Sequence, residues 1–192
     1  MLQREMKLLA LGVTGWKQEP EVGSDGFTYH KRAEFGSFLG ALVVILVIEI
    51  IPVHLLLSHF VSPVAAWILT ALTVYSLFWI LGDYHAFRLT VSRVTREGIE
   101  LRVGMRFAAD IRFDQIARLE KCKGHDTETG AVRALVHGEP NLRLDTVEPV
   151  VVTGPYGVKR RGTTLFLLLD EPERFVERVR ELGGLEAGVA PA

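Results

Sequence analysis

The sequence is poor in cysteine and has no excess of charge of either sign. Cys122 is the single cysteine, so the chain can form no internal disulfide, as expected in a reducing compartment. Lys and Arg number 22, and Asp and Glu number 23. This balance gives no support to a nucleic-acid-binding surface. Phosphate-binding glycine loops, paired-cysteine zinc patterns and HExxH motifs are also missing, so the sequence indicates no reaction, metal or cofactor.

Charge is almost missing from one long stretch of the chain. Between Phe35 and Gly82, the only residue charged at neutral pH is Glu49. This explains how a chain that is 23% charged reaches a mean hydropathy of +0.23. A helix rises about 1.5 Å per residue, and the hydrocarbon core of a bilayer is about 30 Å thick. We therefore predict an integral membrane protein with two spans, at 36–60 and 63–81.

The two spans are predicted to form a tight helical hairpin, residues 35–82, because so few residues separate them. Ser62 suits a helix N-cap, Pro63 suits the first turn, and Gly82 suits the position after the last turn. Basic residues flank the hairpin and are absent from its loop: Lys31, Arg32, Arg88, Arg93 and Arg96. Both termini should therefore be cytoplasmic. The alternative is a hairpin buried in a soluble domain, which two adjacent spans of this length disfavour.

The segments at the two ends of the chain carry weaker signals. Residues 1–34 mix Gly, Pro and charge, so we expect a mostly irregular cytoplasmic leader, with a short helix or strand near 6–13. Residues 186–192 read as a frayed tail.

Residues 83–185 are predicted to form a cytosolic domain of antiparallel strands, because apolar residues there recur with a period of two. Pro149 interrupts one strand pattern and indicates an edge or a bulge. Asp170 is expected to cap a helix over 171–182, whose apolar face should pack on the strands. The expected strands are 87–94, 99–104, 105–108, 110–113, 116–120, 131–136, 142–144, 147–153 and 163–169.

Antiparallel strands closed by one C-terminal helix follow the order of elements in a pleckstrin-homology (PH) fold. The stretches "FRLTVSRVTREGIELRVGMRFAADIRFDQIARLE" and "EPVVVTGPYGVKRRGTTLFLLLDEPERFVERV" carry the resemblance, which covers about residues 87–182. The chain resembles bacterial membrane proteins that have a PH-like domain beside a pair of transmembrane helices. The resemblance implies a membrane α-helical hairpin plus an α+β or all-β PH-like barrel with a C-terminal capping helix. It also implies an inner-membrane location.

The resemblance implies a binding or scaffolding module rather than an enzyme. We expect it to recruit a protein partner, or to assemble with itself, at the cytoplasmic face of the membrane. The lipid bilayer is a further expected partner. Neither a cofactor nor nucleic acid is expected. The alternative is a small membrane enzyme or transport component that works inside the bilayer.

The alternative depends on Glu49, which lies near the centre of the first span. A charged side chain at that position costs about 2.5 to 3.5 kcal/mol. We expect its carboxyl group to be neutral or hydrogen-bonded, and to lock the two helices together. Folding the hairpin brings three polar residues of the second span within reach: Thr73, Tyr75 and Ser76. His54 could join Glu49 in a proton relay or ligand site. The two lie about 140° apart around the helix, so a shared face requires a bend at Pro52.

Other residues give weaker indications. Lys159, Arg160 and Arg161 follow a "GPYG" turn, where they form either a solvated loop or a contact with anionic headgroups. Gly36 and Gly40 have a spacing that permits close helix approach, within the hairpin or in a dimer. A nucleophile and base pair, Cys122 and His125, falls in an expected loop without a third group, so catalysis there is not expected.

Overall fold

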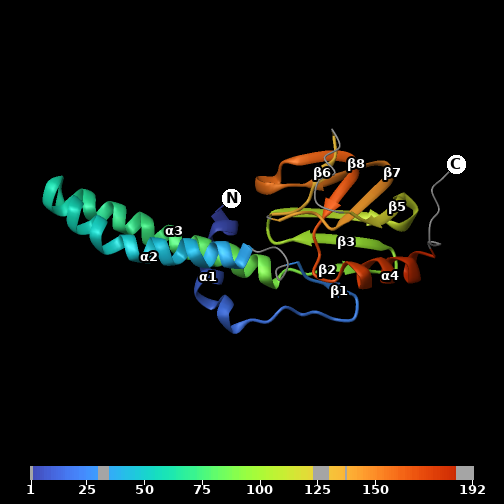
Figure 1. Cartoon of the computed structure of the whole chain (residues 1–192), viewed down its shortest axis with the longest axis horizontal. Coiled ribbons are helices and arrows are strands. Elements are labelled where there is room, and N and C mark those ends of the chain that lie inside the picture. The colour runs from blue at the N-terminus through green and yellow to red at the C-terminus, as the bar shows by residue number, and fades with distance from the viewer. Residues whose placement is uncertain (1, 30–34, 123–129, 137, 185–192) are drawn as a thin grey trace. The chain divides into compact units, whose positions relative to one another are not determined.

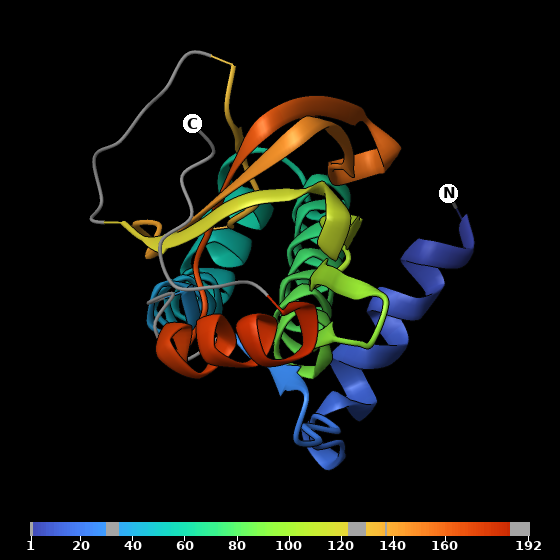
Figure 2. The same cartoon turned by 90° about the vertical axis from the view of Figure 1, so that its right-hand side faces the viewer.

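The structure, a computed structural model, describes residues 2–29, 35–122, 130–136 and 138–184. The chain divides into two compact units (Figures 1 and 2). The helical unit comprises Met1–Glu19 and Gly36–Ala86, and the sheet unit comprises Pro20–Phe35 and Phe87–Ala192. Both units therefore include residues from the segment that the sequence suggested as an irregular leader.

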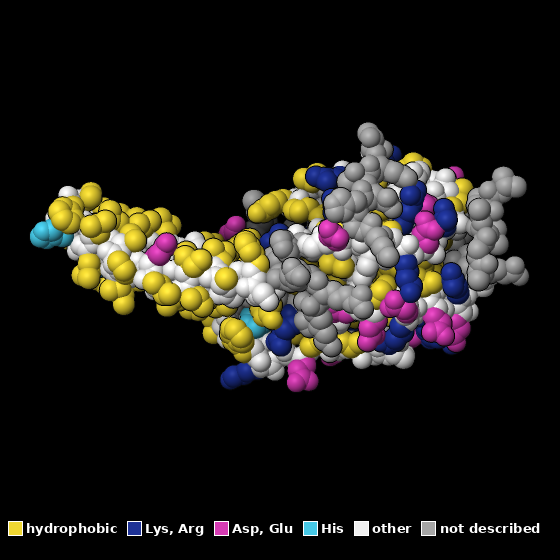
Figure 3. All heavy atoms as spheres, in the orientation of Figure 1, with side chains coloured by type: hydrophobic (Ala, Val, Ile, Leu, Met, Phe, Trp, Pro, Cys, Tyr) yellow, Lys and Arg dark blue, Asp and Glu magenta, His cyan; other side chains and the backbone are white. Residues whose placement is uncertain are grey.

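The helical unit contains two long apolar helices, α2 (Phe35–Phe60) and α3 (Pro63–Leu89), joined by a tight turn. Both are long and apolar enough to cross a membrane, and only 6% of each apolar window is buried. Hydrophobic side chains cover their visible surface, whereas charged side chains gather over the strands (Figure 3). A hairpin at the core of a soluble domain would bury these side chains. The exposure therefore disfavours that alternative and is consistent with association with a membrane.

The helix α3 does not end at Gly82, as the sequence predicted, but continues to Leu89. A different helix, α1 (Leu2–Thr14), crosses α3 at this glycine. A Cβ atom on Gly82 would overlap the carbonyl oxygen of Leu8, and one on Gly12 would overlap that of Phe78. Gly82 therefore permits a close approach of two backbones instead of ending a helix.

The expected irregular leader is largely ordered. Its first part is α1, followed by a short 3-10 helix, η1 (Gly15–Lys17), and the strand β1 (Gly26–Phe27) follows later. The helix suggested near 6–13 is thus confirmed, and it is longer than expected. Short helices are marginal in water and depend on tertiary packing. Here that packing comes from α3, which buries Leu8.

The described residues of the sheet unit form one mostly antiparallel sheet of eight strands. They are ordered β1-β2-β3-β4-β7-β8-β6, and β5 pairs with β7. Only the β6–β8 pair is parallel among the described strands. The remaining strands are β2 (Ser92–Val94), β3 (Gly98–Val103), β4 (Phe107–Arg112), β5 (Ile116–Lys121), β6 (Val132–Arg133), β7 (Leu142–Thr153) and β8 (Lys159–Leu167).

Several predicted strand boundaries are wrong. Phe87 and Leu89 belong to the end of α3, because that helix continues past Gly82. The predicted strands 105–108 and 110–113 merge into β4, and 142–144 and 147–153 merge into β7. In β7 the pairing with β8 shifts register between Asp145 and Val150, so the irregularity predicted from Pro149 is confirmed.

The C-terminal helix α4 (Pro172–Gly183) packs on the sheet through an apolar face that includes Phe175 and Val179, both fully buried. Asp170 does not cap it, contrary to the prediction, because this carboxylate accepts a hydrogen bond from the Thr28 hydroxyl at 2.7 Å. Glu171 occupies the N-cap position, but its side chain makes no capping hydrogen bond. The tail 186–192 lies outside the described residues.

The segment around β1 is fastened to α4 and belongs to the sheet unit. The Phe27 ring packs edge-on against Phe175 at 5.0 Å, and the guanidinium of Arg174 lies over the Phe27 ring at 4.9 Å. Arg178 forms an ion pair with Asp25 at 2.7 Å. The sheet unit is therefore assembled from residues on both sides of the helical hairpin, and it does not begin at residue 83.

Candidate functional site

A groove of about 200 Å³ lies between α2 and α3, and most of the predicted intramembrane residues meet there. Its polar lining comes from Glu49 and His54 of α2 and from Thr70 and Thr73 of α3. The rest of the lining is apolar: Leu46, Ile50, Val53, Leu57, Ala66 and Leu69. The groove thus places a carboxyl, an imidazole and two hydroxyl groups in otherwise hydrocarbon surroundings.

His54 links the two helices through a polar contact. Its Nδ1 atom lies 2.8 Å from the Thr70 hydroxyl oxygen, so either the hydroxyl donates to the ring or the ring N–H donates to the hydroxyl. The imidazole also packs edge-on against Trp67, with ring centroids 4.9 Å apart. These contacts fix the orientation of the imidazole near the loop end of the hairpin.

Glu49 lines the same groove, and among the described residues no hydrogen bond joins its side chain to that of His54. Leu46, Ile50, Val53 and Leu57 form the helical stripe that faces α3. Helix geometry places Glu49 and His54 about 70° to either side of this stripe. Both side chains therefore border one groove, although the same geometry puts them about 140° apart around α2. A bend at Pro52 is not needed to bring them there.

Of the three polar residues of α3 that were predicted to lie within reach of Glu49, one lines the groove. Thr73 lines the groove, but Tyr75 and Ser76 do not. The Thr73 hydroxyl donates to its own helix at the carbonyl of Leu69, at 3.0 Å, and the Ser76 hydroxyl donates likewise to Leu72, at 2.8 Å. Thr70 was missed. Applying the same hairpin pairing to His54 as to Glu49 would have pointed to that part of α3.

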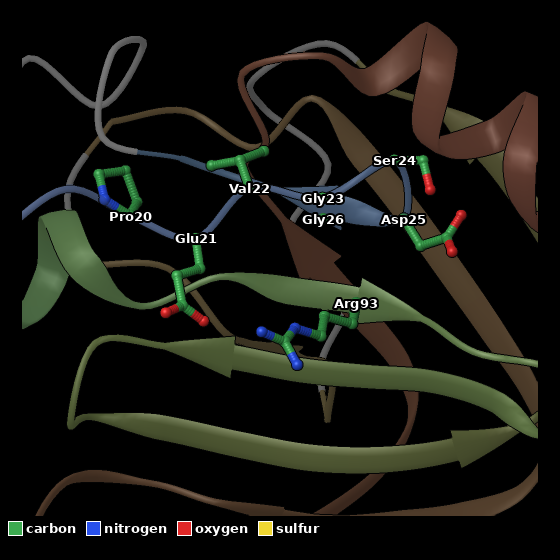
Figure 4. A pocket seen from close by; sticks show the side chains of 8 residues that line it. All are labelled: Pro20, Glu21, Val22, Gly23, Ser24, Asp25, Gly26 and Arg93. Atoms are coloured by element: carbon green, nitrogen blue, oxygen red, sulfur yellow. The ribbon is translucent and has the colours of Figure 1, made fainter.

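A wider concavity of about 630 Å³ lies in the sheet unit, beside β1 and β2 (Figure 4). The loop 20–26 and Arg93 line it, and the Glu21 carboxylate and the Arg93 guanidinium point toward one another. Asp25 is already paired with Arg178, and the Ser24 carbonyl accepts a hydrogen bond from Arg174. The loop therefore uses its polar atoms to hold α4. No group of three or more metal-ligating side chains occurs in the described part of the chain.

The turn between β7 and β8 presents an exposed apolar tip, which we define as residues 154–158. Tyr156 is 77% exposed and has φ +58°, a left-handed conformation that is rare for a residue with a side chain. Val158 is 56% exposed. Such strained conformations persist where the surrounding structure holds them, and they cluster at functional sites. Here the Gly154 N–H donates to the Val158 carbonyl and closes the turn.

The predicted basic cluster lies immediately after this tip. Lys159, Arg160 and Arg161 are exposed, but they begin β8 and pair with Thr153, Val152 and Val151 of β7. The expectation of a loop at this position is therefore wrong, because the cations stand on a regular ladder. The result is an exposed apolar tip on a basic two-stranded stem.

Two further predicted features do not form sites here. A Cβ on Gly36 would make only an ordinary contact with the Tyr84 ring, and one on Gly40 would meet nothing within 4 Å. Their spacing therefore brings no close helix approach at Gly40 within the hairpin, and its use in a dimer stays a prediction. Cys122 is half-buried and its backbone N–H donates to Asn141, while His125 lies outside the described residues.

Three features of the described residues can therefore bear function: the α2/α3 groove, the tip with its basic stem, and the apolar surface of the hairpin. The groove offers proton-exchanging groups, and the tip offers an aromatic anchor beside three cations. Comparison with protein-family models, with curated proteins and with solved structures found no match to this chain.

Proposed function

We propose that the chain is a membrane-anchored binding module of PH-like fold, which recruits a protein partner at the cytoplasmic face of a bacterial inner membrane. In this proposal α2 and α3 cross the membrane and both termini are cytoplasmic. Support comes from the order of elements: two helices long and apolar enough to span, then mostly antiparallel strands, then one helix. Arg88 is in the last turn of α3, at the end that this proposal makes cytoplasmic, whereas Lys31 and Arg32 lie outside the described residues.

The observation that carries the binding role is the exposed tip of the β7–β8 turn. Tyrosine and arginine are enriched among residues that dominate the energy of protein interfaces. At this tip, Tyr156 and Val158 offer apolar surface, and Arg160 and Arg161 stand beside them. The partner that fits best is a protein with an apolar pocket and an acidic rim. A second copy of the chain would be the self-assembling form of the same proposal.

The experiment is affinity purification of the intact chain from native membranes in mild detergent. The test variant combines Tyr156→Ser with Val158→Ser. The control is Val147→Ser, which changes a comparably exposed valine of β7 outside the tip. We expect the same partner with the unmodified chain and the control, and at least a several-fold loss with the double variant. Equal recovery from all three would show that the tip is not the binding surface.

Replacing Lys159, Arg160 and Arg161 together by Gln separates protein binding from lipid contact. Cations held near an anionic headgroup surface give about 1 kcal/mol each. If they contact lipid, the triple variant should keep its protein partner and lose affinity for anionic lipid. If they surround the partner's site, the variant should lose the partner instead.

A second candidate function rests on the groove between α2 and α3. Its supporting observation is that Glu49 and His54 border one groove, with the imidazole oriented by Thr70. In this alternative the chain is a transport component or membrane enzyme, and the two groups pass a proton or hold a small polar ligand. Glu49→Gln keeps the size of the side chain but removes its proton exchange. We expect the substitution to abolish proton uptake by proteoliposomes in this alternative and to leave partner recruitment unchanged.

A further inference from the structure

The helix α1 carries two separate apolar stripes, and only one of them packs against α3. Leu8 and Gly12 lie on the packed stripe. Met6 and Val13 are seven residues apart, which is about two turns, and form a second stripe. They are 62% and 64% exposed. Leu9 lies between the two stripes and is half-buried. A helix that only covered α3 would have no need of the second stripe.

The crossing point places α1 at the edge of the apolar span. It meets α3 at Phe78 and Gly82, and the next residue, Asp83, is the first charged side chain after the span. When α3 crosses a bilayer, this is the level at which hydrocarbon gives way to headgroups. In the proposed orientation, α1 thus lies at the same depth as the cytoplasmic end of the hairpin.

The direction of α1 also fits this boundary. It runs across the long axis of α2 and α3 rather than along it (Figures 1 and 2). The order of its contacts around α3 gives the sense of the crossing. Along α1 and into η1, Leu8 meets Gly82, Gly12 meets Phe78 and Gly15 meets the His85 ring. Helix geometry places these three residues of α3 at successive angles around its axis. With α2 and α3 across the membrane, α1 therefore lies in the membrane plane.

Helix handedness then determines where each face of α1 points. Successive residues advance clockwise by about 100° when a right-handed helix is viewed from its N-terminus. Met6 and Val13 lie about 130° clockwise of the packed stripe, and Lys7 and Thr14 lie about 130° the other way. For the observed sense of crossing, the first pair faces the span and the second pair faces the cytoplasmic side.

We infer that α1 is an interfacial membrane helix, whose Met6–Val13 stripe is buried at the boundary between headgroups and acyl chains. The inference rests on the proposed function, because it requires α2 and α3 to cross the bilayer. Trp16 follows α1, is 62% exposed and packs edge-on against His85 at 4.4 Å. Tryptophan is enriched at this depth of membranes. The occupant of the stripe is the bilayer that holds the hairpin, and α1 fixes how deep the hairpin sits.

The test places nitroxide labels on the full chain in phospholipid nanodiscs, in a Cys122→Ser background. Single cysteines replace Met6 or Val13 on the apolar stripe, and Lys7 or Thr14 on the polar stripe. Collision with oxygen, which concentrates in lipid, is compared with collision with a water-soluble nickel chelate. We expect an oxygen-to-nickel ratio several-fold higher at the first two positions than at the second two.

Ile51→Cys supplies the reference, because Ile51 lies near the middle of α2 and is exposed. A lipid signal at Ile51 with nickel-accessible labels at all four α1 positions would overturn the inference and leave the membrane hairpin intact. Nickel accessibility at Ile51 itself would overturn the proposed function as well. A lipid signal at Ile51, Met6 and Val13 alone would support both.

A second measurement leaves α1 unaltered, so it stays informative if a labelled variant fails to fold. The chain has three tryptophans, and Trp67→Phe with Trp79→Phe leaves only Trp16. We expect lipids brominated near the headgroup to quench its fluorescence several-fold more than lipids brominated at the end of the acyl chain. Absence of quenching by either lipid would overturn the placement of α1.

Discussion

Two glycines of the helical unit differ in what an added methyl group would meet. At Gly82 it would overlap the backbone of Leu8, whereas at Gly40 it would meet nothing within 4 Å. Alanine is favoured over glycine by about 1 kcal/mol inside a helix. The two substitutions should therefore have opposite effects, although both change a glycine within a long apolar helix.

We predict that Gly82→Ala displaces α1 from α3, because the backbones can no longer approach as closely. Trypsin cleavage after Lys7, measured in detergent, should become several-fold faster. Gly40→Ala is the matched control and should leave this rate unchanged, with equal or slightly higher thermal stability. Equal cleavage rates in the two variants would show that α1 is not held by the contact at Gly82.

Tyr29 is predicted to make the stability of the sheet unit depend on alkaline pH. Burial raises the pKa of this phenol above its usual value of about 10, because the phenolate would lose its hydration, and the Gly104 N–H offsets only part of this effect. The folded state therefore favours the protonated phenol. Its contribution to stability is complete below about pH 10 and is lost as the pH rises toward the folded-state pKa.

The substitution Tyr29→Phe tests this dependence. It leaves the part-buried Gly104 N–H without its acceptor, so we expect a loss of about 1 to 3 kcal/mol at neutral pH. The difference in free energy of unfolding between the parent and the variant should shrink above about pH 10. Tyr156→Phe, at an exposed position, should leave the parent's pH dependence unchanged. A Tyr29→Phe difference that stayed constant with pH would contradict the prediction.

At the scale of elements, the sequence is most informative where its signal is local. The start of α3 at Pro63 follows from turn chemistry, and α4 lies within one residue of its predicted bounds, because both patterns use neighbouring residues. The predicted end of α3 failed because a glycine that permits close packing looks the same in sequence as one that ends a helix. The strand β1 has only two residues and forms by pairing with β2. A stretch this short has no periodicity that could predict a strand.

The candidate site was predictable to a similar extent. Glu49 and His54 were found because polar residues are conspicuous in an apolar run. For Thr70, hairpin pairing with His54 indicates only the level along α3. Which face of α3 meets α2 depends on helix rotation, which packing sets. The exposed tip at Tyr156 needed the structure as well, because a left-handed φ and an exposed fraction cannot be read from residue types.

The strand β1 supports the next prediction, because its Phe27 is fully buried beneath α4. Replacing a buried phenylalanine by alanine typically costs about 3 to 5 kcal/mol. We therefore expect Phe27→Ala to lower the free energy of unfolding of the sheet unit by about that amount, measured by urea denaturation. Val22→Ala, at an exposed position of the same segment, should change it by less than about 0.5 kcal/mol. Similar effects from both would show that β1 is not part of the folded core.

At the scale of the whole molecule, the hairpin lies in the sequence between two segments of the sheet unit. The segment 20–29 precedes the hairpin, yet it supplies β1, the ion pair of Asp25 with Arg178, and the bond from Thr28 to Asp170. The hairpin is therefore an insertion into the sheet unit. Its two attachment points are close, because the Tyr29 and Phe87 rings pack with centroids 4.7 Å apart.

This arrangement predicts which soluble fragment will fold. A fragment of residues 87–184 lacks β1 and exposes Phe175, so we expect it to aggregate or to unfold without a cooperative transition. A second fragment begins at Pro20 and has a short Gly-Ser linker between Tyr29 and Phe87 in place of the hairpin. It restores the missing strand. It should be monomeric and should unfold cooperatively in urea. The same fragment with Phe27→Ala should lose about 3 to 5 kcal/mol. If residues 87–184 alone unfolded at the same urea concentration as the linked fragment, the segment before the hairpin would be an accessory to the sheet rather than a part of it.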